Sequence, residues 1–327
     1  MVLEGPRRIA LHDVETVVPG SGHTAVNVRA VGICGTDLSI FHGSIPVGYP
    51  RILGHEIVGV VAAGDLPTGS RVVVDPSVTC GACMLCREGR GNLCTSGWLL
   101  GRDRDGGLQE TLLVPSSNLH PVSDSVSDTV APSIQVLSTC VHGQAMAEVG
   151  PGISVAVIGL GVTGLMHVQL ANAAGAAPIV GISRSATKLA LGESMGAVGV
   201  AADTPGVDEV VRDITEGGAE IVIECAGAVA TLAQAVRIAR PGGRILAYGT
   251  ITDDEGAFPY YQLYYKELAV LSPRAATPND LEIAVETVAA GTVDLEALVT
   301  DRVTLEDAAD ALVRVGGPDT LKIVVDV

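Results

Sequence analysis

Aromatic residues are scarce in this sequence: they make up 3% of its 327 residues, although 47% are hydrophobic. The core must therefore be built mainly from valine, alanine, leucine and isoleucine. Aliphatic cores are typical of parallel sheets whose strands are covered by helices on both faces. The chain is long enough for two domains of ordinary size.

Basic residues are also few. Lysine and arginine number 20 against 37 aspartates and glutamates, which gives a net charge of −17. A surface of that charge repels nucleic acid and anionic membranes, so we expect neither as a partner. The charge favours solubility and does not report on the fold. A ligand that carries phosphate would need a local positive site on this chain.

Long apolar runs are missing as well. No uncharged apolar stretch reaches the roughly 18 residues of a membrane span, and the first residues, MVLEGPRRIALHD, lack the apolar segment of a signal peptide. We therefore expect a cytoplasmic protein. In that compartment seven cysteines favour metal binding or catalysis over disulfides.

Short runs rich in valine and isoleucine, separated by glycine and proline, fill the N-terminal part of the chain, positions 1–135. These runs are typical of antiparallel strands in an irregular β domain and cover residues 25–31, 57–63, 70–74 and 109–114.

From Val155 the pattern changes to strands that alternate with helices. Strands are predicted over 155–159, 178–182, 220–227 and 242–250, with a short one near Val200. Such alternation predicts a parallel, doubly wound sheet and an α/β fold. We expect residues 138–271 to form this α/β domain and to bind a dinucleotide. Residues 272–327 are expected to complete the β domain that residues 1–137 begin.

A glycine-rich turn, GLGVTG, follows the first of these strands and opens a helix. In a dinucleotide-binding turn, the first glycine allows the bend, the second lets the backbone approach the pyrophosphate, and the third lets the helix pack on the strand. The alternative is a glycine-rich turn without a ligand. The candidate cofactor residues here are Gly159, Leu160, Gly161, Val162 and Gly164.

The end of the second strand favours NADP over NAD. An NAD enzyme usually carries an acidic residue there, which holds the ribose 2′-hydroxyl. This chain has Ser183 and Arg184 instead, with Lys188 one turn later. Serine and arginine can bind and neutralise a 2′-phosphate. The alternative is that Arg184 is solvated or stacks on the adenine.

The ends of later strands supply further cofactor candidates, because ligands of doubly wound sheets bind beyond the carboxyl ends of the strands. They are Cys225, Ala226, Gly249 and Thr250. For Gly249, the alternative is an ordinary turn glycine.

Four cysteines lie close together in the sequence: Cys80, Cys83, Cys86 and Cys94. Four thiolates close a tetrahedral site around Zn²⁺ and leave no open position, so the spacing predicts a structural zinc in the lobe 80–94. Such a metal supplies folding energy to a segment without a core of its own. Free cysteines or a redox pair are the alternative.

A second set of metal-ligating residues is dispersed. Cys34 lies in GICGTD, and His55 and Glu56 lie in GHE. Each motif is weak by itself, since a buried cysteine usually packs as a small hydrophobe.

The order of motifs nevertheless resembles one known family over essentially the whole chain. GICGTD, GHEIVG, the four-cysteine lobe, DRDGGLQE and VAVIGLGVTG follow one another as in the zinc-containing medium-chain dehydrogenases, especially the sorbitol and threonine dehydrogenase branch. The resemblance implies a GroES-like β domain and a Rossmann domain, with the active site in the cleft between them and two zinc ions per chain.

The resemblance also implies roles for individual residues. Cys34 and His55 match catalytic zinc ligands, and Glu56 matches a carboxylate that ligates the metal or lies just behind it. Asp37 matches the acid that orients the metal-binding histidine. Thr36 matches the hydroxyl that takes the alcohol proton.

Two departures from the family pattern concern the proton relay and the zinc ligands. Relatives have a histidine in the proton relay where this chain has Ser39. We consider His42 as its substitute, and the alternative is that the proton leaves through water. Polyol-type relatives have Glu-Pro where this chain has Gln135-Val136, and their glutamate binds the zinc ion or its water. Gln135 is therefore an additional candidate, either as a zinc ligand or as a hydrogen-bond partner of the zinc-bound water. Cys140 is a weaker candidate for zinc and is expected beside the nicotinamide.

The resemblance predicts hydride transfer between a nicotinamide cofactor and a small polar secondary alcohol, such as a polyol, cyclitol or amino alcohol. Phe41, His42 and Trp98 are candidate pocket residues, with core or surface positions as the alternative. We expect a homodimer or homotetramer. The competing functions are a zinc-free quinone or enoyl reductase of the same superfamily and a cofactor-binding protein without catalysis.

Overall fold

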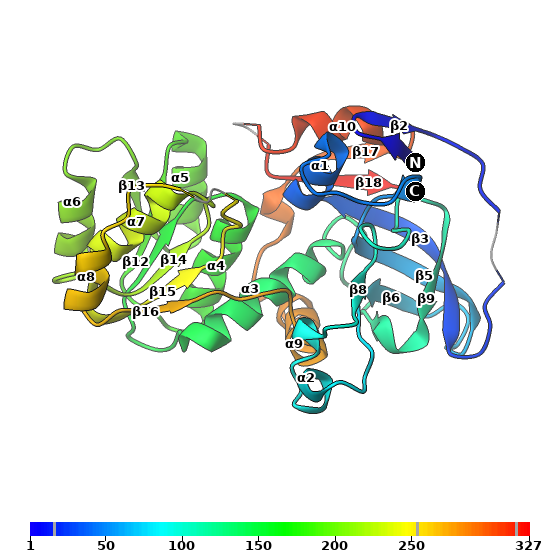
Figure 1. Ribbon diagram of the computed structural model, residues 1–327, viewed down its shortest axis with the longest axis horizontal. Helices are drawn as coiled ribbons and strands as arrows, with labels where there is room; N and C mark the ends of the chain where they lie inside the picture. The colour runs from blue at the N-terminus through cyan, green and yellow to red at the C-terminus, as the bar shows by residue number, and fades with distance from the viewer. Residues whose placement is uncertain (16–17, 253–254, 318–319) are drawn as a thin grey trace. The chain divides into compact units, whose positions relative to one another are not determined.

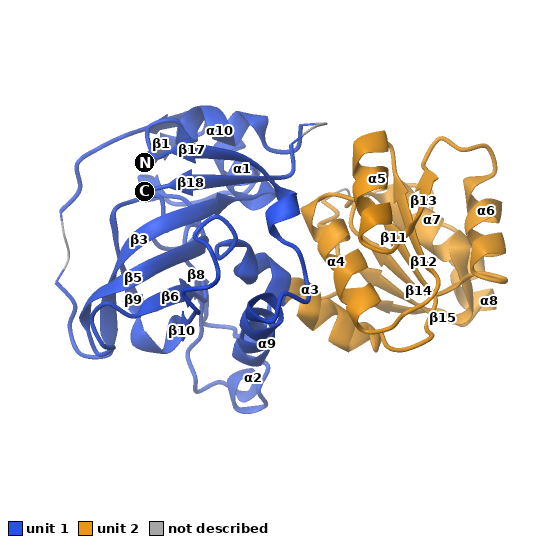
Figure 2. Cartoon of the chain, turned by 180° about the vertical axis from the view of Figure 1, so that it is seen from behind, with its two compact units in different colours: residues 1–138, 275–327 blue, residues 139–274 orange. Residues whose placement is uncertain are grey.

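The computed structural model describes residues 1–15, 18–252, 255–317 and 320–327. Its contacts divide the described chain into two compact units, coloured blue and orange in Figure 2. Unit 1 comprises Met1–Ser138 and Ala275–Val327, and unit 2 comprises Thr139–Arg274. The boundaries predicted from the sequence lie after residues 137 and 271. Among the described helices, none combines the length and the apolar character needed to cross a membrane.

The main sheet of unit 1 is organised around one long strand, β3 (His23–Ile33). β5 (Glu56–Gly64) pairs with it on one side, while β9 (Thr111–Pro115) and β18 (Lys322–Asp326) share the other side. The final strand of the chain therefore completes a sheet that begins near the N-terminus (Figure 1). The outer strands of this sheet are β6 (Arg71–Val74), β10 (Leu119–Pro121) and β17 (Val299–Thr304).

Smaller elements surround this sheet. β1 (Val2–Gly5) pairs with β2 (Arg8–Ala10) and with β4 (Arg51–Ile52), and β7 (Ser77–Val78) pairs with β8 (Trp98–Leu99). The helices of the unit are α1 (Gly35–His42), α2 (Met84–Arg87), α9 (Pro278–Ala289) and α10 (Ala308–Arg314), with short 3₁₀ turns η1 (Gly91–Leu93), η2 (Ser116–Asn118) and η3 (Glu296–Leu298). α3 (Ser133–Ala147) runs across the boundary between the units.

Unit 2 contains a parallel sheet of six described strands, in the order β13-β12-β11-β14-β15-β16. The strands are β11 (Val155–Ile158), β12 (Ile179–Ser183), β13 (Val198–Ala201), β14 (Ala219–Glu224), β15 (Ala239–Ala247) and β16 (Ala269–Leu271). All four residues of β11 are buried, as expected for a strand covered on both faces. The chain builds outward from β11 to β13 and then returns to β14, so the sheet has its topological switch point between β11 and β14.

Helices connect the strands of unit 2: α4 (Val162–Ala173), α5 (Ala186–Ser194), α6 (Val207–Ile214), α7 (Val229–Ile238) and α8 (Tyr260–Tyr265). Aliphatic side chains of strands and helices form a common core, including Ile158, Val222 and Val236. The α/β fold predicted from the aliphatic composition and the strand–helix alternation is confirmed. The strand predicted over 220–227 ends earlier, at Glu224, because the following residues form a turn.

Candidate metal centres and dinucleotide site

Cys34, Asp37 and His55 form a group whose ligand atoms all lie within 4.8 Å of one another. Cys34 follows β3 and caps α1: its Sγ accepts the Thr36 N–H at 3.3 Å, and Asp37 accepts the Cys34 N–H at 3.0 Å. Asp37 also accepts the N–H of Gly54 at 3.2 Å. One buried carboxylate thereby ties the start of α1 to the segment that carries His55.

The sulfur and the imidazole in this group point toward each other. Cys34 Sγ lies 3.1 Å from His55 Nε2, and His55 Nδ1 lies 3.4 Å from Asp37 Oδ1 without a well-aligned hydrogen bond. Burial opposes protonation of His55, but attraction to Cys34 and Asp37 outweighs it and raises its pKa well above the ordinary value. Burial likewise opposes ionisation of Asp37, yet His55 and the two amides lower the pKa of that carboxyl. A cysteine sulfur and an imidazole that face each other in this way are donors that zinc prefers.

Glu56 lies apart from this group, although the motif places it next to His55. Both of its carboxylate oxygens accept hydrogen bonds from Lys322 Nζ, at 2.7 and 2.6 Å, and both side chains are buried. Gly32 faces this carboxylate, since a Cβ there would meet Glu56 Oε2 at 2.2 Å. Of the two placements considered for Glu56, as a ligand or behind the ligands, this geometry favours a position behind Cys34 and His55. The sequence did not identify Lys322 as the partner of Glu56, because no local pattern links two residues so far apart in the chain.

The other residues proposed for this site are more scattered. Thr36 lies on the first turn of α1 and is half-buried, as is Gln135 on α3. His42 is exposed at the far end of α1, about 12 Å along the axis from its start. The structure therefore does not bring His42 to Cys34 and His55. Phe41 is buried in the core of unit 1, and the half-buried Trp98 has the Arg104 guanidinium 6.0 Å from its ring centre.

The four cysteines of the lobe converge on one point. Their sulfurs lie within 4.8 Å of one another, with Cys83 and Cys86 Sγ 3.4 Å apart and Cys83 and Cys94 Sγ 3.9 Å apart. A hydrogen bond from the Cys86 backbone lowers the pKa of the Cys83 thiol to about 6. Neither α2 nor η1, the helical turns of this lobe, contains a buried residue. The lobe thus offers four sulfur ligands and little apolar core.

The glycine-rich turn of unit 2 has the geometry of a dinucleotide-binding turn. Gly159 has φ +92°, which favours glycine, and a Cβ at Gly164 would lie 1.9 Å from the Gly159 carbonyl oxygen. The space around Gly161 is open: a Cβ there would meet no atom within 4 Å. Gly161 caps α4 without a side-chain hydrogen bond, so the helix N-terminus presents free backbone amides to that space. Leu160 is buried beneath the turn, and Val162 begins the helix.

Known proteins resemble the chain along both units. A family model described as an alcohol dehydrogenase GroES-like domain matches residues 20–124, and one described as a zinc-binding dehydrogenase matches residues 162–290. A sorbitol dehydrogenase of Halalkalibacterium halodurans is 30% identical over 98% of this chain and 96% of its own length. The chain belongs to the zinc-containing medium-chain alcohol and polyol dehydrogenase family. It is an NAD(P)-dependent oxidoreductase of that class.

Other relatives agree with this assignment. A sorbitol dehydrogenase of Bacillus subtilis is 32% identical and aligns over 92% of this chain and 89% of its own. The crystal structure of a putative zinc-binding dehydrogenase from Sinorhizobium meliloti, bound to NADP, superposes with a TM-score of 0.93 at 32% identity, covering 100% of this chain and 98% of that one.

In this dehydrogenase, β12 ends at the residues that the sequence connected with cofactor choice. Ser183 is buried, and its Oγ accepts the Ser185 N–H at 3.2 Å. Arg184 is exposed, and no described acidic side chain forms an ion pair with it. Lys188 is half-buried in the first turn of α5, where its N–H bonds to Ser185 Oγ at 3.4 Å. No acidic side chain stands at the end of this strand.

A partly buried polar cluster near the carboxyl ends of β14 and β15 was not foreseen. Tyr248 Oη lies 2.5 Å from Thr139 Oγ1 and 3.5 Å from Cys140 Sγ. Burial and the neighbouring Cys140 raise the pKa of Tyr248 well above its ordinary value, so its hydroxyl stays neutral. Cys140 therefore belongs to unit 2 and lies beside Tyr248. The predicted residues Cys225, Ala226, Gly249 and Thr250 follow the ends of the same two strands.

Proposed function

We propose that this dehydrogenase interconverts a small polar secondary alcohol, such as a polyol, cyclitol or amino alcohol, with its ketone. The observation that supports the site is the approach of Cys34 Sγ to His55 Nε2 at 3.1 Å, with the buried carboxylate of Asp37 3.4 Å from the other ring nitrogen of His55. When bound there, zinc acts as a Lewis acid toward the substrate oxygen. A polyol-type substrate is supported by relatives described as sorbitol dehydrogenase and L-galactonate-5-dehydrogenase.

Different residues of this chain have different roles in the reaction. Cys34 and His55 hold the metal, with Gln135 as a further candidate ligand, and Asp37 fixes the imidazole so that Nε2 faces Cys34. Thr36, on the first turn of α1, receives the hydroxyl proton of the alcohol. Beyond Thr36 we propose that the proton leaves through water, since His42 lies at the other end of the helix.

A second zinc is proposed for the lobe, in a structural role. Four converging sulfurs are the donor set of a closed tetrahedral site, and a bound Zn²⁺ would stabilise them as thiolates. Because such a site needs reduced cysteines, we propose the cytoplasm as the compartment.

NADP is the proposed cofactor. The open space at Gly161 and the N-terminal amides of α4 suit a pyrophosphate. Arg184, which forms no ion pair with a described acidic side chain, suits a 2′-phosphate together with Ser183 and Lys188, on a chain whose net charge otherwise opposes phosphate. When bound, the nicotinamide supplies the hydride acceptor. We propose that Cys225, Ala226, Gly249 and Thr250 line its site.

The proposed function is tested by assaying the zinc-replete protein with NADP and NAD against sugar alcohols, inositols, amino alcohols and simple secondary alcohols. We expect turnover on one of the polar classes and two zinc ions per chain. A chain without zinc that reduces quinones or enoyl compounds would instead identify a zinc-free reductase. Cofactor binding without turnover on any class would identify a non-catalytic protein.

Replacing Ser183 by aspartate and Arg184 by alanine together is expected to shift cofactor preference toward NAD. The new carboxylate repels a 2′-phosphate and accepts a hydrogen bond from a ribose hydroxyl, and each lost charge-assisted contact is worth about tenfold in affinity. The ratio of kcat/KM for NADP and NAD measures the effect. Thr187→Ala, at an exposed position of α5, is the control and should leave the ratio unchanged. An unaltered ratio in the double variant would contradict the proposed role.

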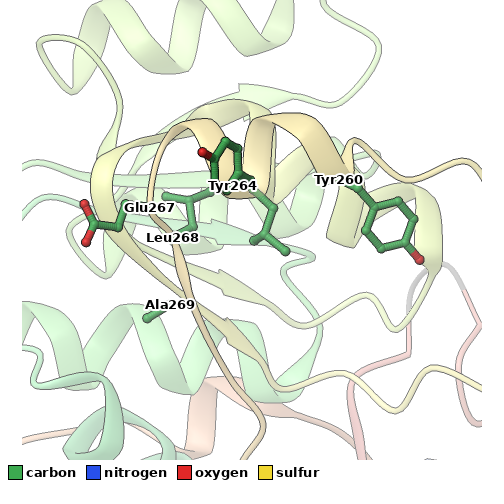
Figure 3. A pocket seen from close by; sticks show the side chains of 6 residues that line it. Tyr260, Tyr264, Glu267, Leu268 and Ala269 are labelled. Atoms are coloured by element: carbon green, nitrogen blue, oxygen red, sulfur yellow. The ribbon is translucent and has the colours of Figure 1, made fainter.

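We also propose that the protein forms a homodimer through the β16 edge of unit 2. In a chain with 3% aromatic residues, α8 carries four tyrosines, Tyr260, Tyr261, Tyr264 and Tyr265, each at least 73% exposed. A groove of about 530 Å³ lies between this helix and β16, lined by Tyr260, Tyr264 and Glu267 among others (Figure 3). Residues 257–271 contain one lysine and one glutamate, so this patch is neutral on a chain of net charge −17.

A second copy suits this patch better than an unrelated partner. Among the described strands β16 pairs only with β15, so its outer edge has free backbone groups that can pair with the same strand across a two-fold axis. Tyrosine is enriched at such interfaces, and charge is depleted at their centres. Two strongly acidic copies can approach most easily where each is neutral.

Replacing Val270 by lysine is expected to convert the dimer to a monomer. Val270 lies in β16 and is 44% exposed, so two lysines would meet across the axis and repel each other. Light scattering coupled to size-exclusion chromatography measures the mass. Val198→Lys is the matched control, since Val198 is 47% exposed on β13 at the opposite edge of the same sheet. A dimer that survives Val270→Lys but not Val198→Lys would show that the interface lies at the β13 edge of the sheet and not at the β16 edge.

A further inference from the structure

Glu224 is a buried acidic residue to which the proposed reaction assigns no role. It is the last residue of β14 and is fully buried. Its Oε1 accepts three hydrogen bonds of 2.8 Å each, from the N–H groups of Ala226 and Gly227 and from the Thr231 hydroxyl. Among the residues that the structure describes, none gives its Oε2 a hydrogen bond and no basic side chain forms an ion pair with this carboxylate.

This arrangement is costly for a residue with only a packing role. Burying a carboxylate with one unsatisfied oxygen is unfavourable, and a neutral side chain could accept the same three hydrogen bonds. A charged acceptor, however, makes each of those bonds about twice as strong. The carboxylate therefore holds the turn after β14 more firmly than an amide would.

The turn that Glu224 holds closes the switch point of the sheet. Ala226 N lies 3.0 Å from the position of a Cβ on Gly159, the first glycine of the dinucleotide-binding turn. On the other side, a Cβ on Gly249 would lie 2.4 Å from Gly227 N and 2.8 Å from Glu224 Oε2. The Glu224 carbonyl also accepts the N–H of Gly249 at 2.7 Å. The ends of β11, β14 and β15 thus meet around one glutamate.

We infer that Glu224 is a positioning residue for the nicotinamide cofactor. By drawing the amides of Ala226 and Gly227 inward, it fixes the turn between β14 and α7 at the place where ligands of doubly wound sheets bind. The turn is then ordered before the cofactor arrives, which removes an entropic cost of binding. This inference rests on the proposed function, because it takes the turn after β14 to line the cofactor site.

The test uses the full chain with zinc and compares Glu224→Ala and Glu224→Gln with the wild type. NADPH and NADH binding is followed by the fluorescence of the reduced nicotinamide. We expect Glu224→Ala to weaken binding of the preferred cofactor by about tenfold or more, because all three accepted bonds are lost. The cofactor affinity of Glu224→Gln should lie between that of Glu224→Ala and that of the wild type, since an amide oxygen still accepts the three hydrogen bonds, although more weakly. The KM for the cofactor should rise in parallel, with kcat at saturation changed less than about threefold.

Val236→Ala provides the matched control. Val236 is a fully buried core residue on α7, so this variant loses stability without touching the turn. It should bind the cofactor like the wild type at a temperature where all variants are folded. Equal binding by Glu224→Ala and the wild type, equally weak binding by the alanine and glutamine variants, or equally weak binding by Val236→Ala would each overturn the inference.

Hydrogen exchange without cofactor separates this inference from the proposed function. Amide exchange of residues 225–228 should be faster in Glu224→Ala than in either the wild type or Val236→Ala. If the wild type binds neither NADPH nor NADH, the proposed function fails and the exchange result still decides whether Glu224 holds the turn. Unchanged exchange at 225–228 in Glu224→Ala would overturn the inference whatever the cofactor affinity.

Discussion

Replacing Cys34 by serine is expected to remove one of the two zinc ions proposed for each chain and to lower kcat/KM by about a thousandfold or more. The thiolate is lost from the pair that converges at 3.1 Å, and a serine hydroxyl is a poor substitute ligand. A metal acting as a Lewis acid contributes several kcal/mol to the reaction, and each loss of about 1.4 kcal/mol in transition-state stabilisation lowers the rate tenfold. Elemental analysis and steady-state kinetics on the same preparation measure both quantities.

Serine is the informative replacement because it should leave the fold intact. Cys34 caps α1 by accepting the Thr36 N–H, and serine is a preferred residue at that position. The thermal midpoint should therefore stay within a few degrees of the wild type, and the remaining zinc should stay bound in the lobe. Full activity with two zinc ions in Cys34→Ser would rule out the catalytic role of Cys34.

Cys94→Ser is expected to empty the zinc site of the lobe and to unfold that segment. Apparent binding free energies of structural zinc sites are about 10–16 kcal/mol, and the lobe has no buried residue in α2 or η1 to compensate. Cys94 is the most deeply buried of the four cysteines, so its loss also opens the interior of the site. Zinc content should fall to one ion, and trypsin should cut rapidly after Arg87 and Arg90, which are exposed in the lobe.

A variant in the same lobe that keeps the four sulfurs controls for surface changes. Met84 is 70% exposed on α2 and offers no ligand to the proposed site, so Met84→Ala should keep both zinc ions and resist trypsin like the wild type. If Cys94→Ser retains two zinc ions and the same digestion pattern, the lobe does not bind zinc through these four sulfurs.

Features that depend on residues close together in the chain can be predicted from the sequence. The four lobe cysteines, Cys80 to Cys94, are separated by only a few turns of backbone, which suffice to bring them together. Two of the fingerprint glycines are required by local geometry: Gly159 has φ +92°, and a Cβ on Gly164 would lie 1.9 Å from the Gly159 carbonyl oxygen. The α/β fold followed from alternating segments whose hydrophobic period sets the element type.

Features that depend on distant segments were decided only by the tertiary structure. Cys34 and His55 meet because β3 and β5 pair antiparallel, with Gly32 opposite Glu56, so the end of one strand adjoins the start of the other. The same register turns Glu56 toward Lys322 on the last strand. Cys34 and His42 share one short helix, and its rise separates them.

The sequence by itself determined the family and the fold class, and it indicated the two sets of candidate metal-ligating residues. Local spacing and hydrophobic period fix those features. Only the tertiary structure decided which donors the buried acids bind: the amides of Cys34 and Gly54 for Asp37, the amine of Lys322 for Glu56, and the turn after β14 for Glu224. The physical reason is that the cost of burying a carboxylate is offset by whichever donors the folded chain brings to it, and those donors come from strand pairing and loop contacts that no local pattern encodes.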